Sequence, residues 1–152
     1  MDSTYINHPI TSVAWYGATA FAEYYKMRLP SVLEWEKVAR GITGNAYPWG
    51  NENNSNRSNF ENSADPWESG TTPIGYYNGI NLETIDSKSP FGAYDMAGNV
   101  WEWTSEINSI NKYILKGGSY QNPSFNQTTT IEHTSYPTDI LNNFGFRCAR
   151  DL

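Results

Sequence analysis

The stretch from residue 41 to residue 90 constrains the fold most, because glycine, asparagine, serine and proline dominate it. Such a composition leaves little room for long helices or strands, so this part of the chain must run mainly as loops. Aromatic residues recur within it at Tyr47, Trp49, Trp67 and Tyr76. Because disordered segments are usually poor in aromatic residues, we expect ordered loops, held in place by something other than a hydrophobic core, such as a bound metal.

The segment before these loops predicts two helices. "TSVAWYGATAFAEYYKM" indicates a short strand-like run and then an amphipathic helix with one shared face. That face is formed by Ala18, Phe21, Ala22 and Tyr25. The second helix lies in "RLPSVLEWEKVARG", where Ser31 and Glu34 have the spacing of a capping box and Gly41 supplies the stop.

The C-terminal part returns to strand-like runs, in "NVWEWTS", "YILKGGSY" and "FGFRCARDL". At 152 residues the chain is long enough for one core, so we expect a single domain over residues 1–152. The pattern favours an α+β fold with two short helices, a small twisted antiparallel sheet and long irregular loops.

The charge and the cysteine content exclude several classes of function. A net charge of -6 and an isoelectric point near 4.8 argue against nucleic acid or an anionic membrane as a partner. No apolar run reaches the length of a membrane span, and the start "MDSTYINHPI" lacks the features of a signal peptide. We therefore expect no membrane insertion, and display on a virion or cell would need another route. Cys148 is the sole cysteine, which excludes an internal disulfide, and we expect it to be a small buried residue.

Five motifs occur in order along the chain: "RLPSVLEWEKVARG", "YPWGN", "FGAYDMAGNVWEWTSE", "KGGSY" and "GFRCAR". Together they make the sequence resemble the formylglycine-generating enzyme or sulfatase-modifying-factor domain, which has a C-type-lectin-like fold. The resemblance covers residues 8 to 150. It implies a C-type-lectin-like domain with a shortened N-terminal portion.

The resemblance implies a structural calcium ion at "DMAGNVWEW". The matching ligands are the side chains of Asp95 and Glu102 and the carbonyls of Gly98 and Val100. These are the hard oxygen donors that calcium prefers. In the alternative interpretation, Glu102 simply points outward on an alternating strand.

A second calcium site is implied at "SNFENSADPW", where the loop has one extra residue. Its ligands would be the side chains of Asn59 and Asp65 and the carbonyls of Phe60 and Trp67. The alternative is an ordinary asparagine-rich turn.

The resemblance also locates the catalytic cysteines of formylglycine-generating enzymes, which bind copper as thiolates after the "GGS" segment. The matching positions here are Asn122 and Gln127. An amide cannot form a thiolate or support soft-metal redox chemistry, so we expect no redox cofactor and no enzymatic activity. His8 and His133 belong to no metal-ligand spacing, and we expect polar surface residues there.

No lysine or arginine lies between Lys116 and Arg147, where small polar and aromatic residues are crowded together. Such side chains suit adaptable recognition surfaces, although a polar loop is the plainer interpretation. The chain also resembles variable proteins of diversity-generating retroelements, which share the lectin-like fold and end in a comparable "WEW … GGS … GFR" region. Adenine-directed mutagenesis of AAC-like codons yields the residue types that are enriched at 108–143.

This second resemblance implies a non-catalytic protein that displays a variable face to a protein or cell-surface ligand. The alternative is a sulfatase-modifying-factor-type oxidase or an accessory domain of an enzyme. The predicted ligand-contact residues are Asn108, Asn111, Tyr113, Tyr120, Asn122, Ser124, Phe125, Asn126, Thr128, Thr130, His133, Tyr136 and Asn142.

Overall fold

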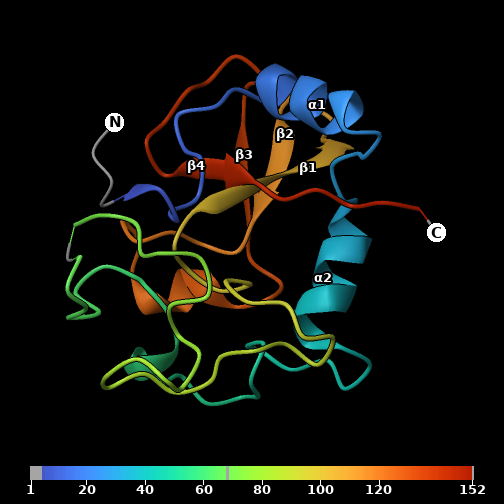
Figure 1. The fold of residues 1–152 in the computed structure, drawn as a ribbon. Helices are drawn as coiled ribbons and strands as arrows, with labels where there is room; N and C mark the ends of the chain where they lie inside the picture. Colours follow the sequence, from blue (N-terminus) through green and yellow to red (C-terminus); the bar gives the residue numbers. More distant parts are fainter. Residues whose placement is uncertain (1–4, 68, 152) are drawn as a thin grey trace.

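The computed structural model describes residues 5–67 and 69–151 and contains two helices, which stand on either side of a small sheet (Figure 1). The helices are α1 (Trp15–Tyr24) and α2 (Val32–Arg40). The strands are β1 (Trp101–Ile107), β2 (Tyr113–Lys116), β3 (Glu132–Ser135) and β4 (Phe144–Phe146). Short 3₁₀ turns, η2 (Ser55–Arg57) and η3 (Ser124–Gln127), interrupt the loops. No helix in the described part of the chain is long and apolar enough to cross a membrane.

The sheet has the strand order β3-β2-β1-β4 and is mixed. β1 pairs with β2, and β2 with β3, in antiparallel fashion, but β1 and β4 are parallel. The prediction of an antiparallel sheet is therefore wrong at this edge. β3 and β4 both run in the same direction as β1, so the chain crosses from the end of β3 to the opposite end of the sheet before it enters β4. A tight hairpin would instead have made β4 antiparallel to the strand before it. β3 itself, in the polar segment "EHTS", carried no strand signal in the sequence.

The first helix differs in part from its prediction. Ala18 and Ala22 are buried, but Phe21 and Tyr25 are 47% and 56% exposed. The two rings pack against each other at the surface, and Phe21 also contacts Phe146 of β4. Residues 11–14 form no strand, because Ser12 has a positive φ of 55° that breaks an extended run.

The capping box of the second helix is confirmed. The Ser31 hydroxyl accepts a hydrogen bond from the Glu34 amide at 3.1 Å, and the Glu34 carboxylate accepts one from the Ser31 amide at 2.8 Å. Gly41 ends the helix with a φ of 65°, as its position predicted. These local contacts orient α2 so that Trp35 and Ala39 are buried.

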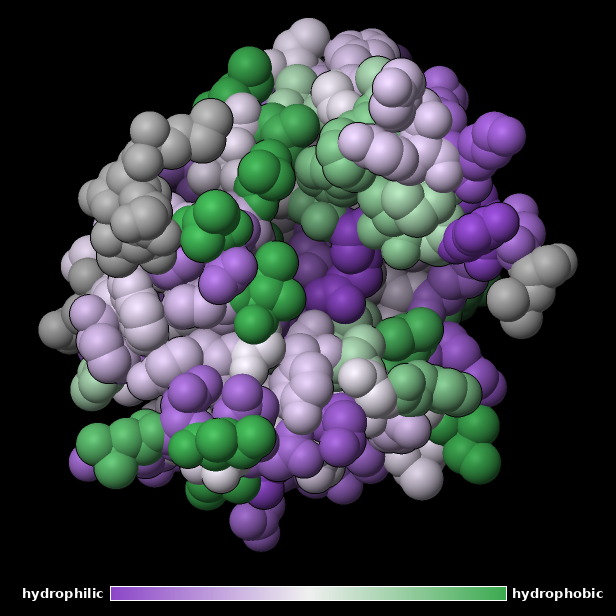
Figure 2. Space-filling model, in the orientation of Figure 1, coloured by the Kyte–Doolittle hydropathy of each residue, from purple (hydrophilic) through white to green (hydrophobic). Residues whose placement is uncertain are grey.

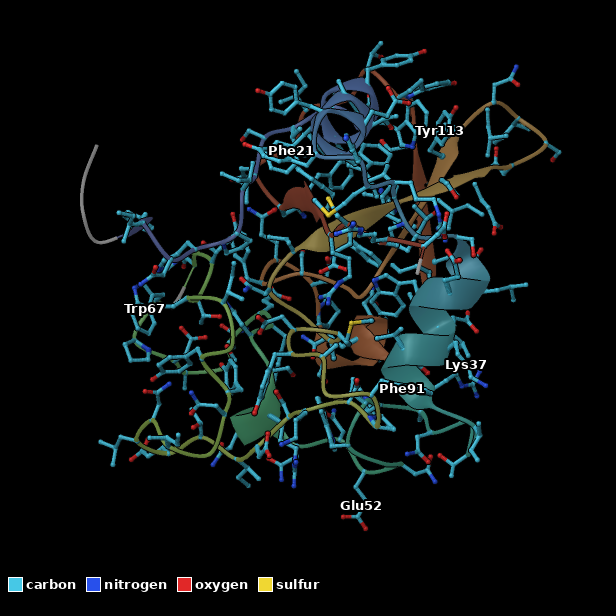
Figure 3. All side chains as sticks on the ribbon, turned by 45° about the vertical axis from the view of Figure 1, so that its right-hand side comes forward. Phe21, Lys37, Glu52, Trp67, Phe91 and Tyr113 are labelled. Atoms are coloured by element: carbon cyan, nitrogen blue, oxygen red, sulfur yellow. The ribbon has the colours of Figure 1, made fainter. Side chains whose placement is uncertain are left out.

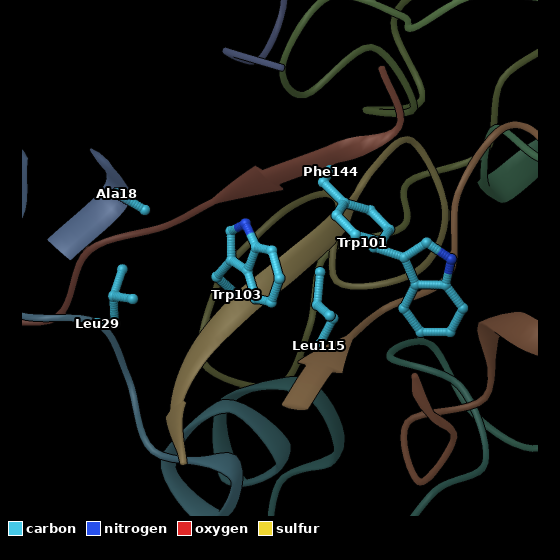
Figure 4. Close-up of a cluster of buried hydrophobic side chains, with 6 residues drawn as sticks. All are labelled: Ala18, Leu29, Trp101, Trp103, Leu115 and Phe144. Carbon is cyan, nitrogen blue, oxygen red and sulfur yellow. The ribbon is translucent and has the colours of Figure 1, made fainter. Parts of the chain in front are cut away.

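Two apolar clusters lie on opposite sides of the sheet. The first joins α1 to the sheet (Figure 4) and consists of Ala18, Leu29, Trp101, Trp103, Leu115 and Phe144. Tyr113 projects from β2 toward α1 (Figure 3), where its ring stacks on Trp15 at 3.9 Å. The second cluster joins α2 to the loops through Trp35, Ala39 and Met96. Because side chains alternate along β1, the two tryptophans face α1 while Glu102 faces α2.

The long loops are held by hydrogen bonds to the turn that precedes β1. The Asn99 side chain accepts from the Thr72 amide and donates to the Thr72 carbonyl, and the Asn99 amide donates to the Asn59 carbonyl. Farther along, the Thr129 amide donates to the Ala46 carbonyl. This network explains how a segment with so few apolar residues is ordered.

Candidate functional site

Glu102 links four parts of the fold. One of its oxygens accepts hydrogen bonds from the Trp35 indole of α2 at 2.6 Å and from Arg147 Nε at 2.5 Å. The other oxygen accepts from Arg147 Nη2 at 2.7 Å, and Nη2 also donates to the carbonyls of Tyr94 and Asp95. Burial opposes the charge of Arg147, but Glu102 outweighs burial and raises the pKa of Arg147 above its usual value. The carboxylate is therefore an architectural anchor for β1, α2, the segment after β4 and the turn before β1.

The turn from Asp95 to Glu102 does not fit a calcium site in which Glu102 is a ligand. Both Glu102 oxygens already accept hydrogen bonds from a guanidinium, which a calcium ion would have to displace. Asp95 accepts a hydrogen bond from the Gly75 amide at 2.7 Å, and burial raises the pKa of Asp95 to about 6. Gly98 is buried with a φ of 76°, and its amide donates to the Gly117 carbonyl, while Val100 is buried beside it. Within the described residues, no three His, Cys, Asp or Glu side chains cluster as metal ligands, so a cation at either candidate site would depend on backbone or amide oxygens as well.

The loop from Asn59 to Trp67 offers oxygen donors without a competing cation. Asp65 accepts hydrogen bonds from the Trp67 amide, the Ser63 hydroxyl and the Tyr77 hydroxyl at 2.8 to 3.1 Å. In the described part of the chain, no lysine or arginine pairs with Asp65. Burial, with a further contribution from Asp65, raises the pKa of Tyr77, which stays a neutral donor.

The remaining oxygens of this loop take part in turns. The carbonyls of Phe60 and Trp67 accept from the amides of Ser63 and Gly70. Asn59 is buried, and its side-chain nitrogen donates to the Gly70 carbonyl at 2.9 Å. Each carbonyl keeps a second lone pair, so these residues fit an oxygen-coordinated cation better than the turn at Glu102 does.

Asn122 and Gln127, which the resemblance predicts to stand at the thiol positions of formylglycine-generating enzymes, both make hydrogen bonds within the fold. The Asn122 carboxamide oxygen accepts from the Trp101 indole at 2.7 Å and from the Ser119 hydroxyl at 2.6 Å. Gln127 is 1% exposed. Its side-chain oxygen accepts a hydrogen bond from the Ser58 hydroxyl, and its side-chain nitrogen donates one to the Asn59 carbonyl. Asn122 was predicted as a ligand contact, but its carboxamide oxygen is already engaged within the domain.

The structure places two of the predicted contact residues, Asn122 and His133, against Trp101, and joins two others, Tyr120 and Asn142, through Gln121, which precedes Asn122 in the sequence. Besides Asn122, the His133 ring lies 5.4 Å from the Trp101 ring. The Gln121 side chain, which the sequence did not single out, donates to both the Tyr120 hydroxyl and the Asn142 side chain. We call the set Tyr120, Gln121, Asn122, His133 and Asn142 the Trp101 patch. Ser124, Phe125 and Asn126 continue from it on η3, and Thr128 and Thr130 follow.

The other predicted contact residues form a separate group at the opposite end of β2. Asn108 closes the β1–β2 turn by accepting from the amides of Ile110 and Lys112, and Asn111 has a positive φ of 58° in the same turn. Tyr113 stacks on Trp15, and Lys112 lies 4.7 Å from the Tyr136 ring. The contiguous segment 108–143 therefore does not form one surface, because β2 separates its two ends.

His8 and Cys148 differ from their predictions. His8 is 8% exposed rather than a surface residue; burial lowers its pKa, and its Nδ1 lies 2.9 Å from the Thr71 hydroxyl. Cys148 is only half-buried, because it lies beyond the last residue of β4 and lines a cavity. Burial raises the pKa of the Cys148 thiol, so the thiolate is disfavoured there.

The two helices, the curled mixed sheet and the long hydrogen-bonded loops define an α+β domain of the C-type-lectin-like class. The chain belongs to the sulfatase-modifying factor enzyme 1-like domain family, whose profile matches residues 2–152. It is 33% identical to the serine/threonine-protein kinase Pkn1 of Chlamydia trachomatis, over 100% of this chain and 26% of that protein. It is 32% identical to the inactive C-alpha-formylglycine-generating enzyme 2 of Bos taurus, over 95% of this chain and 50% of that protein. The chain thus spans between a quarter and a half of these relatives.

Solved structures show the same fold. PvdO from Pseudomonas aeruginosa superposes with a TM-score of 0.82 at 20% identity, over 96% of this chain and 63% of the other. The Treponema denticola variable protein 1 gives a TM-score of 0.71 at 18% identity, over 92% of this chain and 70% of the other. The lectin-like fold that the motifs implied is therefore confirmed.

Proposed function

We propose that this domain is a non-catalytic binding module that presents the Trp101 patch and the adjoining η3 residues to a protein or cell-surface ligand. The observation that carries the proposal is the role of Asn122 and Gln127. Where the family resemblance predicts reactive thiols, these residues supply amides that form hydrogen bonds within the domain. The free thiol of Cys148 lines a cavity to which neither of these two residues contributes.

The chemistry of the surface supports recognition. Phe125 on η3 is 66% exposed and Tyr120 is buried within the Trp101 patch, whereas Tyr136, which is 52% exposed, lies outside this surface at the other end of β2. Exposed aromatic rings provide contact area, and the surrounding amides and hydroxyls provide hydrogen bonds. The stretch 117–146 has no lysine or arginine but contains Glu132 and Asp139, so a neutral or cationic partner surface would suit it best.

Two comparisons support this proposal without deciding it. A relative named as inactive shares the family, and variable proteins of diversity-generating type share the fold. We infer that this chain is a variable protein of that kind, with the displayed residues lying mainly at 120–142. The direct test is whether copies of the gene differ at these codons, beside a reverse transcriptase and a template repeat. Invariance at all of them would contradict the inference.

Replacing Phe125, Asn126 and Thr130 together with other polar residues is expected to change stability by no more than about ±0.5 kcal/mol. The reason is that these residues project from η3 and the loop after it, and no side-chain hydrogen bond of theirs is found within the described residues. Asn122→Ala, by contrast, removes the acceptor of the Trp101 indole and is expected to cost about 1–3 kcal/mol. Urea denaturation of both variants checks this. Equal losses would show that η3 belongs to the core, which contradicts display.

The alternative function is oxidation of a cysteine in a sulfatase-type peptide. We expect no formylglycine when such a peptide is incubated with this protein, copper and oxygen, because neither Asn122 nor Gln127 can supply a thiolate. Mass spectrometry of the peptide is the measurement. Cys148→Ser is the matched control, and product that disappears in this variant would make Cys148 a catalytic residue and refute the proposal.

We propose that calcium, which the family resemblance implies, binds the 59–67 loop rather than the turn at Glu102. A ligand that binds only the native state stabilises it by about 2.7 kcal/mol at a hundredfold excess over its dissociation constant. We therefore expect a chelator to lower the melting temperature of the native protein, and Asp65→Asn to abolish that effect. Asp95→Asn is the control and should keep it. The reverse pattern would place the ion at the turn before β1.

A further inference from the structure

A cavity of about 330 Å³ opens below α1 and beside the end of β4. It is visible in Figure 2 as a hollow with hydrophilic residues at its floor and hydrophobic residues around it. The apolar residues of its lining are Pro9, Ile10, Phe21, Ile74, Val100 and Phe146. Ile10 and Ile74 are 67% and 66% exposed, so apolar side chains surround a hollow that is open to solvent. The volume lies within the roughly 300–1,000 Å³ that is typical of small-molecule sites.

The polar part of the lining contains an unused hydrogen-bond donor. Glu102, Asp95 and Arg147 all line the cavity. Arg147 donates through Nε and Nη2, but within the described part of the chain its Nη1 makes no hydrogen bond. Its side chain is 27% exposed, so the guanidinium is accessible. His8 also lines the cavity, and its Nε2 is buried without a hydrogen-bond partner among the described residues. A ligand that covers Arg147 Nη1 would replace the water at this donor best by offering it a hydrogen-bond acceptor.

The charges around this donor favour an uncharged ligand. Glu102 already neutralises Arg147 through two hydrogen bonds, and Asp95 adds a second carboxyl group. A ligand carboxylate would face both acidic side chains, while a ligand ammonium would face the guanidinium. Either charge would also lose hydration on entering a largely apolar cavity. A neutral carbonyl oxygen avoids both penalties.

We propose that the cavity binds a small uncharged molecule with an apolar body and an amide or ketone carbonyl that accepts a hydrogen bond from Arg147 Nη1. The apolar body would lie against Phe21, Val100 and Phe146. No residue of the Trp101 patch lines this cavity, so the proposal is independent of the display function.

Cys148 provides a reporter of occupancy, because it lines the cavity and is the sole cysteine of the chain. The probes are four compounds with the same phenylpropyl body: phenylpropanamide, phenylpropanoate, phenylpropylamine and propylbenzene. Phenylpropanamide at about ten times its dissociation constant is expected to slow alkylation of Cys148 by iodoacetamide about tenfold, in proportion to the free fraction. The two charged analogues and propylbenzene, which has no acceptor, are expected to protect less at the same concentration.

Two variants test whether protection arises in the cavity. Ile74→Trp places a larger ring at the rim and is expected to abolish the protection by phenylpropanamide, measured as the ratio of rates with and without it. Ile80→Trp is the matched control, because Ile80 is 88% exposed and lies outside the lining; it should keep the protection. The proposal is overturned by no protection by the amide, by equal protection by a charged analogue or by propylbenzene, or by protection that persists in Ile74→Trp. Protection by calcium alone would likewise assign the site to a metal.

Discussion

Glu102→Ala is expected to destabilise the domain by about 3–5 kcal/mol, because it leaves the Arg147 guanidinium, which is enclosed except where it lines the cavity, without its carboxylate. The same change removes the acceptor of the Trp35 indole, which connects α2 to β1. Since domains of this size are stable by only about 5–15 kcal/mol, the variant should be close to unfolding at room temperature. The measurement is the free energy of unfolding from urea denaturation, with the melting temperature as a second readout.

Two further variants separate the ion pair from a general effect of losing a carboxylate. Glu23→Ala, at an exposed position on α1, is expected to shift stability by no more than about ±0.5 kcal/mol. The double variant Glu102→Leu with Arg147→Met removes both charges and should be more stable than Glu102→Ala, because no unpaired charge remains. A loss below about 1 kcal/mol for Glu102→Ala would resemble an exposed ion pair and would contradict the architectural role.

Trp103→Ala is expected to cost about 3–5 kcal/mol, the range found when large aromatic residues are removed from a core. The Trp103 side chain is fully buried between α1 and the sheet, and its ring meets the Phe144 ring edge to face at 5.3 Å. Its indole also donates to the Val13 carbonyl at 2.9 Å, which fixes the segment that leads into α1. The variant should therefore lose both packing and the position of α1, as urea denaturation and near-ultraviolet circular dichroism would show.

Trp49→Ala is the matched control, since it removes the same side chain from a half-buried place in the loops. Trp49 stacks on Tyr47 and donates to the Glu52 carbonyl, but it belongs to neither apolar cluster. Trp49→Ala is therefore expected to lower the free energy of unfolding clearly less than Trp103→Ala does. If Trp49→Ala cost as much as Trp103→Ala, the loops would carry as much of the stability as the sheet does, and the division into core and loops would be wrong.

Local signals in the sequence were sufficient for the elements that depend on neighbouring residues. The capping box of Ser31 and Glu34 and the stop at Gly41 predicted α2, because their contacts join residues within one turn of each other. The alternation in "NVWEWTS" predicted β1. β3 was missed because its polar sequence forms a strand only by pairing with β2.

The candidate site was predicted less well, because its contacts join residues far apart in the chain. The order of the motifs identified the family, and with it the lectin-like fold. The same resemblance suggested a metal-ligand role for Glu102, while the structure pairs it with Arg147, 45 residues later. The signal that could have indicated this pair is Arg147 in "GFRCAR", one residue beyond β4, which is the strand that pairs with β1.

The sequence by itself therefore determined the two helices, most strands and the family, since these depend on periodicity, capping and motif order. Only the tertiary structure decided that β4 runs parallel to β1, that Glu102 faces α2 and Arg147, and that residues 108–143 divide into two groups at opposite ends of β2. The physical reason is that side-chain direction and pairing across a sheet are set by which strands meet and in what register. That choice depends on the free energy of the whole packed arrangement, which no local pattern of residues contains.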